Sequence, residues 1–177
     1  MPVVSNVGRH RLKILPNRLP TLDTERLRLR AMEPDDAVDL FCIYGDAETM
    51  RFASDDAFPQ QATVLEMFAS VQRLLADGTS IEWGIDLKSE AKLVGTCGLH
   101  SFEPGDGLAE VGCMLSREAW GKGYMTEALS AVLQYAKQEL DLVALRAVID
   151  EPNVRSVRLL RSLGFQQISA TQYSRKL

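Results

Sequence analysis

Residues 108–129 read LAEVGCMLSREAWGKGYMTEAL, and this stretch decides the fold. Its apolar first third predicts a strand, and the amphipathic pattern from about Tyr124 predicts a helix. Gly121 and Gly123 let the backbone turn sharply between the two. Several N–H groups then converge where the helix leaves its own first donors unpaired, and Lys122 adds positive charge. The turn predicts a cradle for phosphate or pyrophosphate, with a plain strand–helix turn as the alternative.

Two better-known phosphate loops do not fit the spacing of this turn. A Walker A loop would need a glycine where Ser116 stands and a hydroxyl residue where Gly123 stands. A dinucleotide-binding G-x-G-x-x-G would need its third glycine where Thr126 stands. The cradle is therefore of another kind.

The stretch resembles the acetyl-CoA loop of the GNAT N-acetyltransferases, most closely the RimJ/RimL ribosomal-protein N-acetyltransferase branch. The residues that carry the likeness are EVG at 110–112, WGKGY at 120–124 and TEAL at 126–129. A second block, NVRSVRLLRSLGF at 153–165, is similar to the family's "N..S.rll..LGF" at the expected distance. Two blocks in the right order are more specific than one, and the likeness covers residues 22–167.

The basic stretch 1–21 is broken by Pro2, Pro16 and Pro20 and is expected to be a flexible or surface-draped arm, with an arm packed on a partner subunit as the alternative. The resemblance implies a single α/β GNAT domain at residues 22–177. The implied fold is a mixed, mostly antiparallel central sheet with a splayed strand pair and flanking helices. The implied activity is transfer of an acetyl group from acetyl-CoA to a primary amine without a metal, with a protein N-terminal α-amine as the favoured acceptor. A small-molecule amine acetyltransferase and a non-catalytic acyl-CoA-binding regulator are the alternatives.

The resemblance also assigns residues to the acetyl-CoA site. They are Cys113, Met114, Leu115, Trp120, Gly121, Lys122, Gly123, Tyr124, Met125, Thr126, Asn153 and Ser156. Glu110 is the candidate base because it lies on the strand beside the expected thioester, with Glu82 second and a plain surface glutamate as the alternative. Ser156 is the candidate acid in place of the tyrosine that many GNAT enzymes use. Asn153 is expected to bond the pantetheine, to cap a helix, or to do both.

Charged residues outside these motifs also bear on the expected site. Four acids in the loop of residues 46–59 are candidates to meet a cationic amine, although solvated loop acids are the alternative; they are Asp46, Glu48, Asp55 and Asp56. Glu118 stands where the family's general loop pattern has Gln or Arg. It is expected to face the pyrophosphate, with Arg117 as compensation.

The composition is that of an ordinary soluble chain, with 46% hydrophobic and 25% charged residues in a total of 177. A net charge of −4 gives no nucleic-acid footprint, and no apolar run is long enough for a membrane span. Three widely spaced cysteines and two histidines predict neither a zinc site nor a disulfide framework, which favours a cytoplasmic protein. An acyl-cysteine role for Cys113 is one interpretation, and a small buried residue is the other.

Apolar periodicity predicts the remaining elements. Helices are expected from Pro34 to Gly45, from Gln61 to Gly78 and after Tyr124, and strands at residues 26–30, 81–87, 92–102, 108–115 and 143–150. The tail Gln166 to Leu177 is expected to make one strand at most, whereas the family usually closes with a hairpin. Because an uncovered edge recruits another strand, we expect a homodimer through this tail or through the first 21 residues.

Overall fold

The computed structural model describes residues 15–150 and 152–177, in which eight strands form one sheet of order β1-β2-β3-β4-β5-β6-β8-β7. Neighbouring strands are antiparallel except β5 and β6, which are parallel. The mixed, mostly antiparallel sheet predicted from the sequence is therefore confirmed. The strands are β1 (Leu22–Asp23), β2 (Leu27–Arg30), β3 (Ser80–Leu87), β4 (Lys92–Glu103), β5 (Leu108–Leu115), β6 (Ala144–Val148), β7 (Gln166–Gln167) and β8 (Gln172–Lys176).

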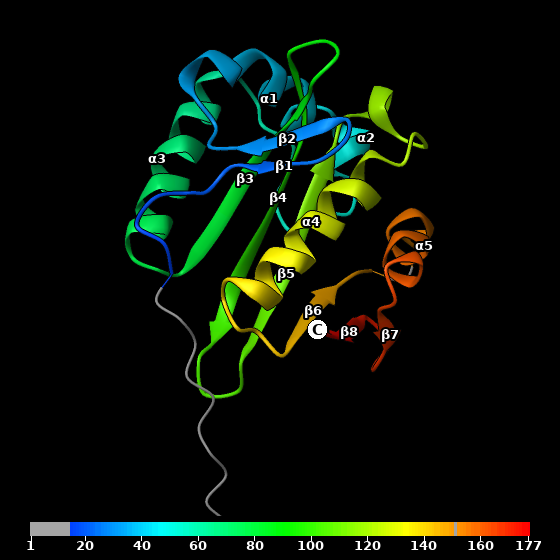
Figure 1. Ribbon diagram of the computed structural model, residues 1–177. Coiled ribbons are helices and arrows are strands. Elements are labelled where there is room, and N and C mark those ends of the chain that lie inside the picture. The colour runs from blue at the N-terminus through cyan, green and yellow to red at the C-terminus, as the bar shows by residue number, and fades with distance from the viewer. Residues whose placement is uncertain (1–14, 151) are drawn as a thin grey trace, which may run out of the picture.

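Helices cover both faces of this sheet (Figure 1). They are the 3₁₀ turn Pro34–Asp36, α1 (Ala37–Tyr44), α2 (Ala47–Met50), α3 (Ala62–Ala76), a 3₁₀ turn Arg117–Ala119, α4 (Tyr124–Gln138) and α5 (Val154–Ser162). On one face α4 packs against β3, where the rings of Trp83 and Tyr135 meet edge to face with centroids 5.5 Å apart. A second core joins α1 and α3 to β4 and includes Ile43, Phe68 and Leu93.

The parallel strands β5 and β6 separate after a short paired segment. Leu108–Glu110 pairs with Ala144–Arg146, while β5 continues to Leu115 and β6 to Val148 without pairing each other. On its β6 side, the second half of β5 has no strand partner. We call the gap between the diverging strands β5 and β6 the wedge. Its unpaired backbone groups need other partners, so it suits a ligand that carries amide groups.

The tail corrects one prediction. It forms a hairpin of two short strands, and the expectation of one strand at most was wrong. The twelve residues of the tail hold both strands because the turn between them is short. A hydrogen bond of 2.9 Å from the Ile168 N–H to the Gln172 carbonyl closes this turn. Strand β8 pairs with β6 along its whole length, from Ala144↔Lys176 to Val148↔Gln172. The edge of β6 is thus covered within the chain.

The loop between the first two predicted helices also contains a helix that the sequence reading missed. This is α2, whose N-cap is Asp46: the carboxylate accepts from the Thr49 backbone N–H at 2.9 Å. A four-residue helix has too little apolar periodicity to show in the sequence, although Asp at this position is a usual cap.

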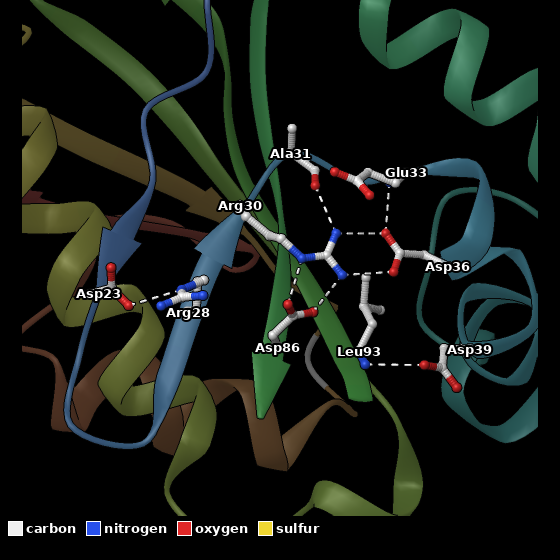
Figure 2. Close-up of polar contacts among 9 residues, drawn as sticks. All are labelled: Asp23, Arg28, Arg30, Ala31, Glu33, Asp36, Asp39, Asp86 and Leu93. Atoms are coloured by element: carbon white, nitrogen blue, oxygen red, sulfur yellow. Dashed lines mark hydrogen bonds and ion pairs between the residues drawn. The ribbon is translucent and has the colours of Figure 1, made fainter. Parts of the chain in front are cut away.

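Arg30 lies partly buried between two aspartates (Figure 2). It donates two hydrogen bonds to Asp36, each of 2.7 Å, and two to Asp86, of 2.5 and 2.9 Å. Asp39 accepts from the Leu93 backbone N–H at 3.1 Å. These contacts fix the start of α1 on the sheet, and α1 carries Tyr44 at its other end.

Only part of the predicted N-terminal arm falls within the described residues. Leu15 and Leu19 pack against the main core. The Pro20 carbonyl accepts a hydrogen bond of 2.7 Å from the indole N–H of Trp83. This piece of the arm is therefore docked on the domain, and residues 1–14 lie outside the described part.

Candidate active site

A cavity of about 1080 Å³ lies at the divergence of β5 and β6. Its walls come from β5, the loop into α4, the start of α5 and residues 48–55. Twelve of the thirteen residues predicted for the site line it: Glu110, Cys113, Met114, Leu115, Trp120, Gly121, Gly123, Tyr124, Met125, Thr126, Asn153 and Ser156. Lys122 does not line the cavity.

The glycine turn has the backbone that an anion cradle needs. Gly121 and Gly123 have φ angles of 74° and 78°, in the left-handed region that favours glycine. Among the described residues, the N–H groups of Gly121, Lys122 and Gly123 donate to no protein acceptor. The free N–H groups of the first turn of α4 follow directly, since Gly123 is its N-cap. Several donors and the positive end of a helix dipole thus meet at one wall of the cavity.

Arg26 holds the outer side of this turn. Its guanidinium donates to the Lys122 carbonyl at 2.9 Å and to Glu127 at 2.7 Å. Glu127 also accepts from the Thr24 hydroxyl at 2.6 Å. Burial alone would raise the pKa of Glu127, but the hydrogen bonds from Thr24 and Arg26 outweigh it and lower the pKa. An ionised Glu127 therefore ties the start of β2 to the first turn of α4 and fixes the shape of the loop.

Two arginines of α5 that the sequence reading gave no role line the cavity, Arg155 and Arg158. The Arg155 guanidinium lies 3.5 Å from the centroid of the Trp120 ring. The Trp120 indole N–H donates to the Leu115 carbonyl at 2.8 Å, which anchors the loop to the end of β5. The spacing of the two arginines, three apart on one helix, is the signal that could have placed both beside the same ligand.

Glu118 corrects another prediction, because it does not face the cradle. Its side chain is 85% exposed and pairs with Lys92 at 3.5 Å. Arg117 pairs with Asp46 at 3.3 Å and does not line the main cavity either. The 3₁₀ turn at residues 117–119 directs both side chains away from the glycine turn, so neither the predicted conflict nor its compensation is present.

Glu110 and Glu82 project from the same face of the sheet but differ in access to the cavity. Glu110 is the last residue of β5 that pairs with β6, and it lines the cavity. Glu82 lies on β3 beneath Tyr44, whose hydroxyl is 3.5 Å from its carboxylate, and does not line the cavity. Burial raises the pKa of Glu82, and hydrogen bonds from Thr96 and Tyr44 offset this only in part. Glu110 is therefore the better placed of the two.

Asn153 and Ser156 lie at the start of α5 and both line the cavity. The Asn153 Oδ1 atom accepts from the Ser156 backbone N–H at 3.2 Å, so Asn153 caps the helix as the alternative prediction held. Within the described part of the chain, neither the Asn153 amide nitrogen nor the Ser156 hydroxyl has a protein partner. Both groups remain free to bond a ligand.

Cys113 lines the cavity as a thiol with little nucleophilic character. Burial raises its pKa to about 11, so it stays protonated near neutral pH. That disfavours the acyl-cysteine interpretation. Across residues 15–150 and 152–177, no group of three or more His, Cys, Asp or Glu side chains is placed to hold a metal ion. In the same residues no helix has the length and apolarity that crossing a membrane demands.

Two of the four acids predicted for the acceptor side line the cavity, Glu48 and Asp55. Asp46 is occupied by capping α2 and by Arg117, and Asp56 does not line the cavity. With Glu110, the cavity wall thus carries three carboxylates. Arg51 also lines the cavity and pairs with Glu48 at 3.8 Å, so a cationic acceptor would be attracted mainly by Asp55 and Glu110.

Comparisons with known proteins agree with this fold. A family model described as an acetyltransferase (GNAT) domain matches residues 26–166. An uncharacterized N-acetyltransferase p20 from Bacillus licheniformis is 34% identical over 84% of either chain. Mycobacterium smegmatis RimJ, solved with CoA-disulfide, superposes with a TM-score of 0.81 at 15% identity, covering 91% of this chain and 89% of its own. A ribosomal-protein-S5-alanine acetyltransferase from Vibrio fischeri gives 0.75 at 17% identity, with 89% and 96% covered.

Proposed function

Because the chain belongs to the GNAT family of N-acetyltransferases, we propose that it moves an acetyl group from acetyl-CoA to a protein N-terminal α-amine. One observation carries the donor side of this proposal. The free N–H groups of the glycine turn open into the same cavity as the unpaired side of β5 and as Glu110. An elongated ligand with a diphosphate at one end and amides along its length fits that order of groups.

Different residues of the wedge would bind different parts of acetyl-CoA. The backbone of Gly121 to Gly123 and the first turn of α4 would hold the diphosphate, with Arg155 and Arg158 as nearby cations. The free amide of Asn153 and the unpaired backbone of β5 near Cys113 and Met114 would bond the pantetheine and orient the thioester carbonyl. When bound, acetyl-CoA supplies an activated acetyl group, so the protein's task is placement and proton transfer.

Proton transfer falls to the polar groups of the same cavity. An amine must lose its proton before it can attack, and Glu110 lies where the two strands part. Ser156, with its hydroxyl free, would supply a proton to the leaving thiolate. Asp55 would attract the cationic acceptor before it reaches this point.

The acceptor class is the finer part of the proposal. Ribosomal-protein acetyltransferases occur among the solved structures that superpose on this chain. A matched panel tests it: peptides with a free α-amine, the same peptides with the α-amine blocked but a lysine present, and small diamines. Thiol release from acetyl-CoA gives the rate, and mass spectrometry gives the acetylated atom.

The outcomes of the panel separate the candidate functions. Acetylation of free α-amines with blocked peptides left unchanged supports the proposal. Turnover with small amines alone would replace the acceptor class. Tight CoA binding without thiol release from any amine would instead identify an acyl-CoA-binding regulator.

A further inference from the structure

His100 lies at an irregularity of β4 that faces the cavity. It is the register partner of Glu110, and the pairing of β4 with β5 breaks between His100 and Glu103. The next residue, Ser101, has a φ angle of 50°, which is unusual for a residue with a side chain. Bulges of this kind are frequent beside active sites, where they re-aim a side chain. The His100 side chain is 45% exposed and lines the cavity.

The two ring nitrogens of His100 meet different surroundings. Nδ1 lies 3.1 Å from the Ser101 hydroxyl and 3.8 Å from the Glu110 carboxylate. Nε2 leans over Gly112, where an added Cβ would be only 3.4 Å away. Because Gly112 has no side chain and itself lines the cavity, nothing on that residue separates Nε2 from the wedge. One end of the imidazole is thus held, and the other is open.

We propose that Nε2 of His100 takes the proton from the acceptor ammonium, while the Ser101 hydroxyl accepts from Nδ1–H and the charge of the Glu110 carboxylate, 3.8 Å from Nδ1, favours that tautomer. This inference rests on the proposed function and makes Glu110 the positioning residue of a pair. Imidazole suits the task because its ordinary pKa is the nearest of any side chain to neutral pH, where proton transfer is most efficient. A carboxylate facing Nδ1 selects the tautomer whose Nε2 lone pair is free.

The proposed step balances without any further reactant. The ammonium gives one proton to Nε2 and becomes a neutral amine, and imidazolium later returns that proton to water. The amine nitrogen bonds to the acetyl carbonyl carbon as the carbon–sulfur bond breaks. The second amine proton then reaches the thiolate, so the products are the amide and the free thiol of CoA.

The other charged groups near the pair are already engaged. Arg146, the register partner of Glu110 on β6, donates to Glu103 at 2.9 Å. Glu82 on β3 lies beneath Tyr44. Among the described residues His100 is the only basic side chain within ion-pair distance of Glu110, so the carboxylate is available to orient the ring.

Nitrogen-15 NMR of the imidazoles tests the tautomer without any acceptor. The sequence has only one other histidine, His10, so His10→Gln leaves a single signal to assign. In its neutral form, we expect His100 to carry its proton on Nδ1, and Glu110→Gln to shift it toward Nε2. A wild-type His100 protonated on Nε2 has no lone pair facing the cavity, and this result would overturn the proposal.

Turnover with acetyl-CoA and the best amine of the panel tests the role. His100→Gln and Glu110→Gln should each lower kcat about 100-fold, with an unchanged KM for acetyl-CoA. The double variant should be no slower than His100→Gln, because the two act as one unit. His10→Gln is the matched control and should keep the wild-type rate.

Each other outcome has a distinct meaning. If the wild type is active and the kcat of His100→Gln lies within threefold of the wild-type value, His100 takes no part in the reaction and Glu110 remains the base. Losses that multiply in the double variant mean that the two residues act separately, which contradicts the pair. A wild type that releases no thiol with any amine sinks the proposed function itself.

Discussion

Gly121 and Gly123 are the residues on which the proposed diphosphate binding most depends. A carboxylate placed on either would sit among the free N–H groups that should hold the anion. We predict that Gly121→Asp weakens CoA binding by about 3 kcal/mol or more, which is over a hundredfold in Kd. Calorimetric titration with CoA measures this.

The matched controls separate charge from backbone strain. A Cβ on Gly121 meets no atom within 4 Å, so Gly121→Ala adds only the strain of a left-handed residue, about 1–2 kcal/mol. Lys122→Ala should change Kd little, because its side chain does not line the cavity. If Gly121→Asp binds CoA like the wild type in a folded chain, the cradle is assigned wrongly.

The two possible roles of Ser156 can be separated, because proton donation affects kcat whereas ligand binding affects the Kd for CoA. Ser156→Ala should lower kcat by about tenfold, less than loss of a full general acid or base, and should leave the Kd for CoA unchanged. Ser130→Ala is the control, since its hydroxyl donates to the Thr126 carbonyl within α4. A change in CoA affinity alone would make Ser156 a binding residue and not the acid.

The site features that the sequence did not predict depend on contacts between residues that are far apart in the chain or on the geometry of a short turn. Gly121 and Asn153 lie in motifs that are local in sequence. The stacking of Arg155 on Trp120 joins residues that are far apart, and no local pattern indicates it. The direction of Glu118 depends on a three-residue turn whose exit angle the sequence does not specify.

At the scale of single elements, the ion cluster around Arg30 sets the position of α1. Burial raises the pKa of Asp36, but hydrogen bonds from Arg30 and from the Glu33 backbone outweigh it, so the pKa is lowered overall. We predict that Arg30→Met costs about 2–3 kcal/mol at pH 7, between the values for exposed and fully buried pairs. Urea unfolding measures the free energy.

The pH dependence of this cost follows from the sign of the shift. A group whose folded-state pKa is depressed stabilises the fold above its unfolded pKa, about 3.9 for Asp, and loses that effect as pH falls through the folded value. The cost of Arg30→Met should therefore shrink toward pH 3. Arg28→Met is the control, because its pair with Asp23 is half exposed and its loss should cost much less than Arg30→Met. A cost of Arg30→Met that does not change with pH would contradict this account of the cluster.

Element length largely decided which elements could be read from the sequence. Strand β5 and helix α4 are long and periodic; β5 has both of its predicted limits, and α4 begins at Tyr124 as predicted. Helix α2 and strand β7 have four and two residues, too few for either period to appear. Their presence depends on a cap and on pairing with β8, which are tertiary features.

At the scale of the whole molecule, the structure removes one of the two interfaces predicted for the homodimer. Strand β8 covers β6, so the tail no longer needs a strand from a second copy. Leu15, Leu19 and Pro20 contact their own domain, so residues 1–14 remain the candidate interface. We predict a dimer for the full chain and a monomer for a chain that begins at Leu15, which keeps the packing of Leu15 and Leu19. Light scattering at micromolar concentration decides this, and two monomers would end the proposal.

The wedge also makes the fold as a whole sensitive to its ligand. Strands β5 and β6 share three paired positions, so the β6–α5–β8 part of the chain is joined to the rest of the sheet along a short seam. A ligand that binds the glycine turn on one side and Asn153 on the other would bridge this seam. CoA at a hundred times its Kd should stabilise the native state by about 2.7 kcal/mol, which raises Tm by about 5–10 °C in a domain of this size. Differential scanning calorimetry measures the shift. Gly121→Asp should lose it at the same CoA concentration while Lys122→Ala keeps it, and an equal rise in all three chains would mean that CoA binds elsewhere.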